Sequence, residues 1–266
     1  SNLLVVLRLC WAEPSLWLLV LGSSVPSLAA LAVCAATGPG ALRRLGARLL
    51  PVGPGVRPGE ALRAYGLAFV LVPVCLLVTF ALRSVWPGAH EGLQPDGIWG
   101  PALLGALLTA SFLDQGGVLE ELGWRGYAQM ELQTDWRSPL AAALIVGVAW
   151  GLWHVPRDVV GGVVERLGLV SYLFLFLPAF VLGTVTTSVV AVWFVNRCGG
   201  SVIPAIVVHG LSNDAVGLAG MVDLEVALTP THQVTKALPM LLLAGALVAV
   251  SGRELGRARS TAGGGA

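Results

Sequence analysis

The chain has 266 residues, of which 56% are hydrophobic and 12% are charged, and its formal net charge is +1. Soluble domains usually carry about 25% charged residues, so this composition, with a mean hydropathy of +0.80, excludes a disordered protein, a fibrous protein and an ordinary cytosolic enzyme. The small net charge gives no electrostatic reason to expect nucleic acid as a partner. The sequence therefore predicts a helical protein whose solvent is the lipid bilayer.

Seven stretches are candidates for membrane-spanning helices, each of which needs about 20 mostly apolar residues. In chain order they cover about residues 15–36, 62–82, 101–132, 139–155, 169–195, 202–221 and 237–250. The expected fold class is therefore all-α, a polytopic transmembrane bundle of about seven spans. Residues 1–260 contain no internal repeat and no soluble domain, so they are interpreted as one membrane-embedded domain. The tail, residues 261–266 (TAGGGA), is expected to be disordered.

Arginine residues in the loops indicate the orientation, because positively charged loops stay on the cytoplasmic side. The loop at residues 40–60 and the C-terminal tail are both rich in arginine, and both fall on one side of a seven-span bundle. We therefore expect an integral protein of the plasma (inner) membrane, with this loop and the C-terminus in the cytoplasm. Residues 1–14 contain charges that suit an interfacial segment better than a span.

The run Glu120-Glu121-Leu122-Gly123-Trp124-Arg125 lies within the third predicted span. An ionisable residue at membrane depth is costly and usually has a partner or a function. Arg125 follows Glu121 by four residues, on the same helix face, and can pair with it. Adjacent residues on a helix point about 100° apart, so Glu120 points elsewhere and suits a general base. The alternative is an ordinary ion pair at a helix end.

Two further spans carry a histidine with a partner one helical turn away. Trp150 and His154 share a face of the fourth span, and His209 and Asn213 share a face of the sixth. Taken singly, His154 could be a core histidine bonded to a backbone carbonyl, and His209 with Asn213 could be polar contacts between helices. Together with the glutamates, these residues could activate a water and stabilise an oxyanion in a cavity between the three helices.

Depth in the membrane places a condition on such a shared site. If the third helix ended at Leu122, Glu120 and His154 would differ in height by roughly 24 Å. If that helix continues to about Leu132, their depths nearly match. A shared site therefore requires a long third helix, over about residues 101–132. Asp114, six residues before Glu120, falls on the opposite face of an ideal helix and is expected to lie outside the site.

The segments EELGWRG (120–126), WGLWHVP (150–156) and HGLSND (209–214) resemble the motifs of the CPBP family of intramembrane proteases. This family includes the CAAX-processing enzyme that trims prenylated proteins, and bacterial proteins tied to bacteriocin self-immunity. All three motifs occur in the family's order, each on an apolar helix. Trp150 stands where the family pattern most often has phenylalanine, and we expect this difference to reshape the wall of the pocket.

The resemblance implies hydrolysis of peptide bonds within the membrane. Carried over position by position, it makes Glu120 the general base for water, with help from His154, while His209 and Asn213 stabilise the oxyanion. Three supporting residues complete the site: Arg125 would hold Glu121, and Trp150 would pack beside His154.

The resemblance leaves open whether the site uses a metal ion. Glu120, His154 and His209 could bind zinc as a Glu/His/His set with an open water position. The sequence has no HExxH segment and no other compact zinc motif, and a mechanism without metal is slightly favoured. We therefore predict no certain cofactor, with zinc as the alternative.

The leading hypothesis is an intramembrane endopeptidase that takes membrane-associated or lipidated peptides or proteins from the bilayer. The glycine-, alanine- and arginine-rich composition is typical of a high-GC bacterium, which favours a peptide or a membrane-protein segment over a prenylated CAAX protein. The first alternative is a non-catalytic membrane protein for immunity or scaffolding. A transporter is less favoured, because it would predict an inverted repeat.

Overall fold

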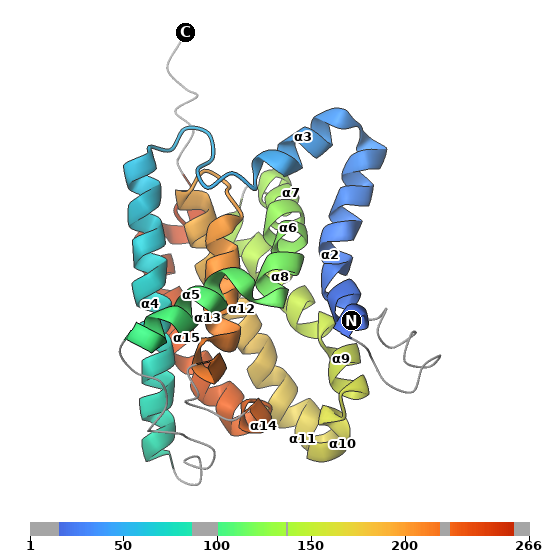
Figure 1. The fold of residues 1–266 in the computed structure, drawn as a ribbon, viewed down its shortest axis with the longest axis vertical. Helices are drawn as coiled ribbons and strands as arrows, with labels where there is room; N and C mark the ends of the chain where they lie inside the picture. The colour runs from blue at the N-terminus through green and yellow to red at the C-terminus, as the bar shows by residue number, and fades with distance from the viewer. Residues whose placement is uncertain (1–15, 87–100, 137, 219–223, 258–266) are drawn as a thin grey trace.

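The computed structural model of the protein describes residues 16–86, 101–136, 138–218 and 224–257. This part of the chain is helical and contains no strand, which confirms the all-α prediction (Figure 1). Its helices are α2 (Leu16–Thr37), α3 (Pro39–Ala47), α4 (Pro58–Val85), α5 (Pro101–Leu113), α6 (Gln115–Gly123), η1 (Trp124–Ala128), α7 (Gln129–Asp135), α8 (Pro139–Trp153), α9 (Val155–Val160), α10 (Val163–Leu167), α11 (Leu169–Ser171), η2 (Tyr172–Phe176), α12 (Leu177–Arg197), α13 (Ile203–Leu218), α14 (Leu224–Ala227), α15 (Pro230–Ser251) and η3 (Gly252–Glu254). The predicted interfacial segment and the C-terminal tail lie outside the described residues.

Six helical segments of the described chain are long and apolar enough to cross a membrane, where about seven spans were predicted. They are Val20–Thr37, Pro58–Val85, Pro101–Asp135, Pro139–Val160, Leu169–Arg197 and Pro230–Glu254. The difference is the sixth predicted span, which forms α13. This helix has 16 residues and is therefore about 24 Å long, shorter than the roughly 30 Å hydrocarbon core of a bilayer.

The third predicted span bends instead of forming one straight helix. It continues to Asp135, beyond the Leu132 that a shared site requires. However, Asp114 has an extended backbone and caps α6, and its carboxylate accepts a hydrogen bond from the amide of Gly117 at 2.5 Å. α5 consequently runs across the bundle, whereas α6 and α7 turn toward the end where α3 lies (Figure 1). Further along, η1 forms a π-helical turn, a feature frequent at functional sites.

The last span begins earlier than its polar sequence predicts. Residues 230–236 contain several polar side chains and were expected in a loop, but α15 starts at Pro230 with Thr229 as its N-cap. His232 is buried in the first turn, and its Nδ1 lies 3.0 Å from Nη1 of the buried Arg83 on α4. Capping and a buried partner thus compensate for the polarity of this turn.

α12 forms the centre of the bundle and packs against α8 and α15, while α13 packs against α5. Residues 189–195 of α12 belong to the main core cluster, together with buried residues of α4, α13 and α15. Many large apolar side chains on the outer faces of the helices are exposed, for example Leu62, Val70 and Leu242. Such exposed apolar surface is what a lipid-facing bundle requires.

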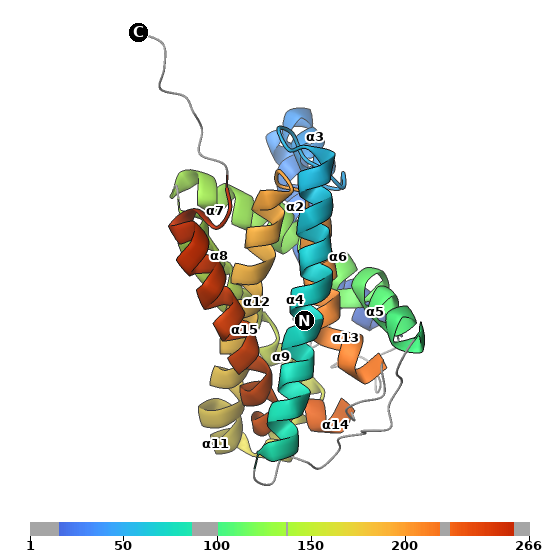
Figure 2. The same ribbon diagram turned by 90° about the vertical axis from the view of Figure 1, so that its left-hand side faces the viewer.

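The arginine-rich segments lie at one end of the bundle. α3 and the C-terminal end of α15 are both at the upper end in Figure 1, and a view turned by 90° agrees (Figure 2). Backbone hydrogen bonds fix the loop after α3 against the turn between α12 and α13: the amide of Val202 donates to the carbonyl of Arg48 at 2.8 Å, and the amide of Gly53 donates to that of Cys198 at 2.9 Å.

α2 contacts α6 through a position that has no room for a side chain. Ser27 donates a hydrogen bond to the carbonyl of Leu119 at 2.6 Å and accepts one from the amide of Gly123 at 3.2 Å. A Cβ atom added at Gly123 would overlap the backbone of Pro26. The close approach of these helices therefore depends on glycine at this position.

We expect Gly123→Ala to lower the thermal unfolding midpoint in detergent, by the equivalent of about 1–3 kcal/mol for an overpacked contact. Gly66→Ala on α4 is the matched control, because a Cβ atom there meets nothing within 4 Å and alanine favours the helix by about 0.5–1 kcal/mol. Equal midpoints for the two variants would contradict the close packing of α2 on α6.

Candidate functional site

The three sequence motifs meet in the interior of the bundle, on α6 with η1, on α8 and on α13. Five of the seven residues singled out from the sequence are buried: Glu120, Glu121, Arg125, Trp150 and His209. His154 is partly exposed and Asn213 is exposed. Ionisable groups from segments up to 88 residues apart in the chain thus form one buried cluster.

One oxygen of Glu121 joins two of the three motifs. Its Oε1 accepts a hydrogen bond from Nη1 of Arg125 at 2.6 Å and lies 2.7 Å from Nδ1 of His209. Because a carboxylate only accepts hydrogen bonds, the His209 ring must donate from Nδ1. Buried carboxylates are strongly stabilised by such paired donors, so this contact fixes α13 against α6.

Glu120 contacts the third motif. Oε2 of Glu120 accepts a hydrogen bond from the indole Nε1 of Trp150 at 2.9 Å, and Glu120 is only 5% exposed. The two adjacent carboxylates therefore have separate partners, as their 100° separation on the helix requires. Phenylalanine, the common residue of the family pattern at position 150, has no N–H group and could not form this bond.

The indole ring of Trp150 also packs against the cationic and aromatic groups around it. The guanidinium carbon of Arg125 lies 4.3 Å from the ring centroid. The rings of His209 and His154 lie with their centroids 4.7 Å and 5.9 Å away, each in an edge-on arrangement. A cation over an indole face in a desolvated site is favourable by roughly 2 kcal/mol or more, so Trp150 connects all three motif helices.

His154 lies at the C-terminal end of α8, with a ring orientation set by the backbone. Its Nδ1 lies 2.7 Å from the carbonyl oxygen of Trp150, to which it must donate. The ring also contacts Phe180 of α12, with the centroids 5.1 Å apart. Donation from Nδ1 leaves Nε2 as the nitrogen that can exchange a proton or bind a substrate group.

Asp114 lies beside the site, which corrects the expectation that it points away. Its Oδ1 is 4.0 Å from Nε2 of His209. The ideal-helix projection fails because the helix is interrupted at Asp114 itself. The sequence does carry a signal for this break, since an aspartate shortly before the pair Gly116–Gly117 is typical of a helix start. A Cβ atom at Gly116 would come within 2.8 Å of Nε2 of His209, so glycine allows this approach.

Asn213 is not joined to the cluster by a hydrogen bond in the described part of the chain. It lies one helical turn beyond His209 on α13, and its side chain is exposed. In that turn, Ser212 is bonded to the carbonyl of His209 at 2.8 Å. The role of Asn213 in binding an oxyanion therefore stays a prediction.

The three residues named as zinc ligands are not arranged as a ligand set. Among the described residues, no group of three or more His, Cys, Asp or Glu side chains is placed to hold a metal ion. Glu120 uses Oε2 for Trp150, and His209 uses Nδ1 for Glu121. These bonds leave Oε1 of Glu120 and Nε2 of His209 as ligand atoms, and a histidine that binds a metal usually donates its other ring N–H to an acceptor in this way. Zinc therefore stays the alternative to a mechanism without metal.

Fold and cluster together define a multi-pass integral membrane protein with a buried polar site between its helices. Residues 99–214 match the family model described as "Type II CAAX prenyl endopeptidase Rce1-like". A protein named CAAX prenyl protease 2, from Methanococcus maripaludis, is 29% identical over 158 residues, which cover 57% of this chain and 55% of that protein. The matched region is thus similar to CAAX proteases, in agreement with the resemblance of the three motifs to the CPBP family. The chain spans about half the length of this curated relative.

We expect Glu121→Gln to destabilise the protein strongly, because Arg125 has 0% exposure and would lose its counter-charge. Removing one partner of a buried ion pair costs about 3–5 kcal/mol. Glu165→Gln on α10 makes the same chemical change at an exposed position and should leave the thermal unfolding midpoint in detergent unchanged. A Glu121→Gln midpoint equal to that of the control would show that the Glu121–Arg125 ion pair does not stabilise the protein as predicted.

Proposed function

We propose that the protein is an intramembrane endopeptidase that hydrolyses peptide bonds of membrane-associated or lipidated peptides or proteins. The observation that carries this proposal is the buried Glu120 carboxylate, bonded to Trp150, whose ring packs against both His154 and His209. The region matched by the CAAX endopeptidase family contains all of these residues. A structural contact between helices would need the Glu121–Arg125 pair, but it gives no reason for a second buried carboxylate beside it.

In this proposal Glu120 is the general base. Its Oε2 is oriented by Trp150, and Oε1 takes a proton from a water as the water oxygen forms a bond to the scissile carbonyl carbon. The π electrons of the carbonyl move to its oxygen, which becomes an oxyanion. The proton held by Glu120 then passes to the amide nitrogen as the C–N bond breaks, so that the products are a carboxylic acid and an amine. His154 assists through Nε2 by holding the attacking water.

The oxyanion is assigned to His209 and Asn213. His209 is anchored by donation from Nδ1 to Glu121, and as an imidazolium it would also donate from Nε2. Asp114 near Nε2 would orient this ring. Donors fixed in a water-excluded site are worth about 2.7–4 kcal/mol each in comparable enzymes. Further polar atoms of the motif, Nε and Nη2 of Arg125 and Nε1 of Trp124, have no hydrogen-bond partner among the described residues.

We also propose that the arginine-rich end of the bundle faces the cytoplasm, with the protein in the plasma (inner) membrane. The loop at residues 40–60, Arg197 and the segment with Arg253 and Arg257 share this end, in keeping with the excess of positive charge on the cytoplasmic side. Residues 1–260 would act as one protease domain.

The proposal predicts that Glu120→Gln and His154→Ala each abolish cleavage by the purified protein. A quenched-fluorescence library should contain farnesylated CAAX peptides and non-lipidated apolar peptides. We expect a loss of about 10²–10⁴-fold in kcat/KM, the typical contribution of a general base, with unfolding midpoints close to wild type. Glu165→Gln is the matched control and should retain full activity.

Cleavage that persists in both variants would overturn the site assignment. Adding a zinc chelator to the wild-type assay tests the role of metal separately. The mechanism without metal predicts an unchanged rate, and a loss of cleavage would support bound zinc.

A second prediction concerns the residue that departs from the family pattern. Trp150→Phe keeps an aromatic ring beside His154 and removes the N–H donor to Glu120. A hydrogen bond to a charged group is worth about 1.5–3 kcal/mol, so kcat/KM should fall by roughly 10- to 100-fold. The loss should be mainly in kcat, because the bond orients the base. A kcat equal to that of wild type would mean that the Trp150–Glu120 bond does not serve the reaction.

A further inference from the structure

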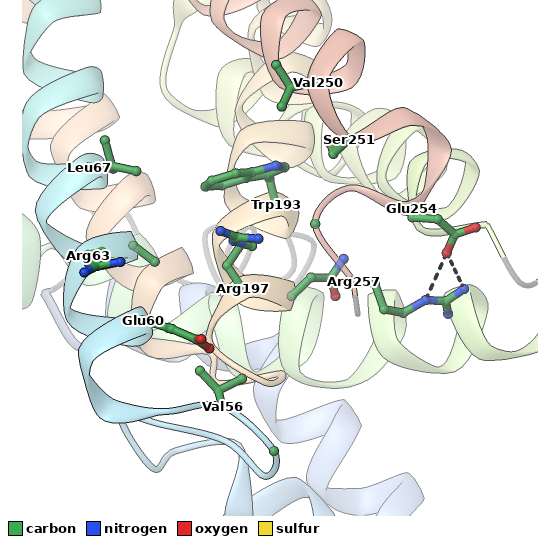
Figure 3. A pocket seen from close by; sticks show the side chains of 14 residues that line it. Val56, Glu60, Arg63, Leu67, Trp193, Arg197, Val250, Ser251, Glu254 and Arg257 are labelled. Carbon is green, nitrogen blue, oxygen red and sulfur yellow. Dashed lines mark hydrogen bonds and ion pairs between the residues drawn. The ribbon is translucent and has the colours of Figure 1, made fainter. Parts of the chain in front are cut away.

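A cavity of about 620 Å³ lies at the arginine-rich end of the bundle, apart from the motif site. It lies between α4, α12 and the C-terminal end of α15 (Figure 3). The motif site is built instead from α6, α8 and α13. The volume of the cavity falls within the range of small-molecule sites, about 300–1,000 Å³. Neither the proposed reaction nor the packing of the bundle accounts for the charged groups that line it.

Two arginines from different helices line this cavity. Figure 3 shows them, Arg63 on α4 and Arg197 on α12. Both are exposed, and among the described residues neither forms an ion pair. The third lining arginine, Arg257, differs because it is bonded to Glu254 at 2.9 Å. With Glu60 as the remaining acidic residue, the cavity has an excess of positive charge.

A buried tryptophan supplies a further donor at the same place. Trp193 lines the cavity and is only 8% exposed, and its indole Nε1 has no hydrogen-bond partner in the part of the chain that the structure describes. The guanidinium of Arg197 lies 5.3 Å from the centroid of this ring. A buried indole N–H usually finds a partner, so this donor points to a ligand with an acceptor oxygen.

The rim of the cavity carries two exposed apolar side chains. Leu67 and Val250 line the cavity and are 45% and 83% exposed. They belong to α4 and α15, two of the helices long enough to cross a membrane. A ligand that fills this cavity therefore meets cations and an N–H donor at one end and hydrocarbon at the other.

We propose that this cavity binds the headgroup of an anionic phospholipid. The phosphate would lie between Arg63 and Arg197 and accept a hydrogen bond from Nε1 of Trp193. The part of an acyl chain next to the headgroup would lie along Leu67 and Val250. Basic pockets between membrane helices suit such headgroups, and each arginine near the bilayer surface contributes about 1 kcal/mol of attraction. A free phosphate shares the charge but leaves the apolar rim unused.

Native mass spectrometry of the detergent-purified full chain, titrated with phosphatidylglycerol or phosphatidylcholine, tests this site. We expect wild type to prefer phosphatidylglycerol, and Arg63→Gln with Arg197→Gln to weaken that binding by about fivefold per arginine. The control pair, Arg43→Gln with Arg253→Gln, removes the same charge from exposed positions at the same end but outside the cavity, and should keep the preference.

Trp193→Phe is a second variant, which keeps the ring and removes the donor, and it should lower binding of phosphatidylglycerol more than that of phosphatidylcholine. Equal binding of phosphatidylglycerol by the Arg63/Arg197 variant and the control pair would overturn the proposal. So would displacement of the lipid by excess inorganic phosphate, which would indicate a site for the free anion.

Discussion

The rest of the site depends on the two interactions that Oε1 of Glu121 makes. It is bonded to Arg125 on its own helical segment and to His209 on α13, and all three groups are almost fully buried. Separate burial of these charges would cost several kcal/mol for each ion, so the helices that carry them are stable only when the groups meet. Trp150 adds α8, because its ring packs on Arg125 and His209 while its N–H group holds Glu120.

This arrangement explains how two neighbouring glutamates can have different tasks in the reaction that we propose. Glu121 is committed to the ion cluster, and a base bonded to both an arginine and a histidine is poorly placed to accept another proton. Glu120 accepts a hydrogen bond from the indole of Trp150, and the ring of Trp150 packs against both His154 and His209. The proposed chemistry thus follows from a structural division of labour between residues that are adjacent in the sequence.

Several of these features could be predicted from the sequence, and others could not. The spacing of Glu121 and Arg125, and the depths of Glu120 and His154, depend only on helix geometry, so the meeting of the motifs was predictable. The bend at Asp114 was missed although aspartate is a common N-cap residue, because the apolar pattern continues on both sides of it and predicts one unbroken span. The start of α15 was missed for the opposite reason, since its polar first turn is compensated by contacts with residues distant in the sequence, such as Arg83. The Trp150–Glu120 bond also requires a tertiary structure to be seen.

The arginines at the arginine-rich end are relevant to two separate properties, the orientation in the membrane and the proposed lipid site. Arginine in the loops indicates orientation in the membrane, and two arginines at the ends of α4 and α12 also line the cavity that we assign to a lipid headgroup. A lipid bound there would contact α4, α12 and α15 and would steady the core helix α12, against which α8 with Trp150 and His154 packs.

A double-mutant cycle between Glu121 and His209 tests the central claim most directly. The unfolding free energy in detergent would be measured for wild type, Glu121→Gln, His209→Ala and the double variant. The account predicts a coupling energy above about 1 kcal/mol, in the range found for residues within one hydrogen-bonded network. Additive effects, within about 0.3–0.5 kcal/mol, would contradict it, because they would show that the shared carboxylate does not hold α13 to α6.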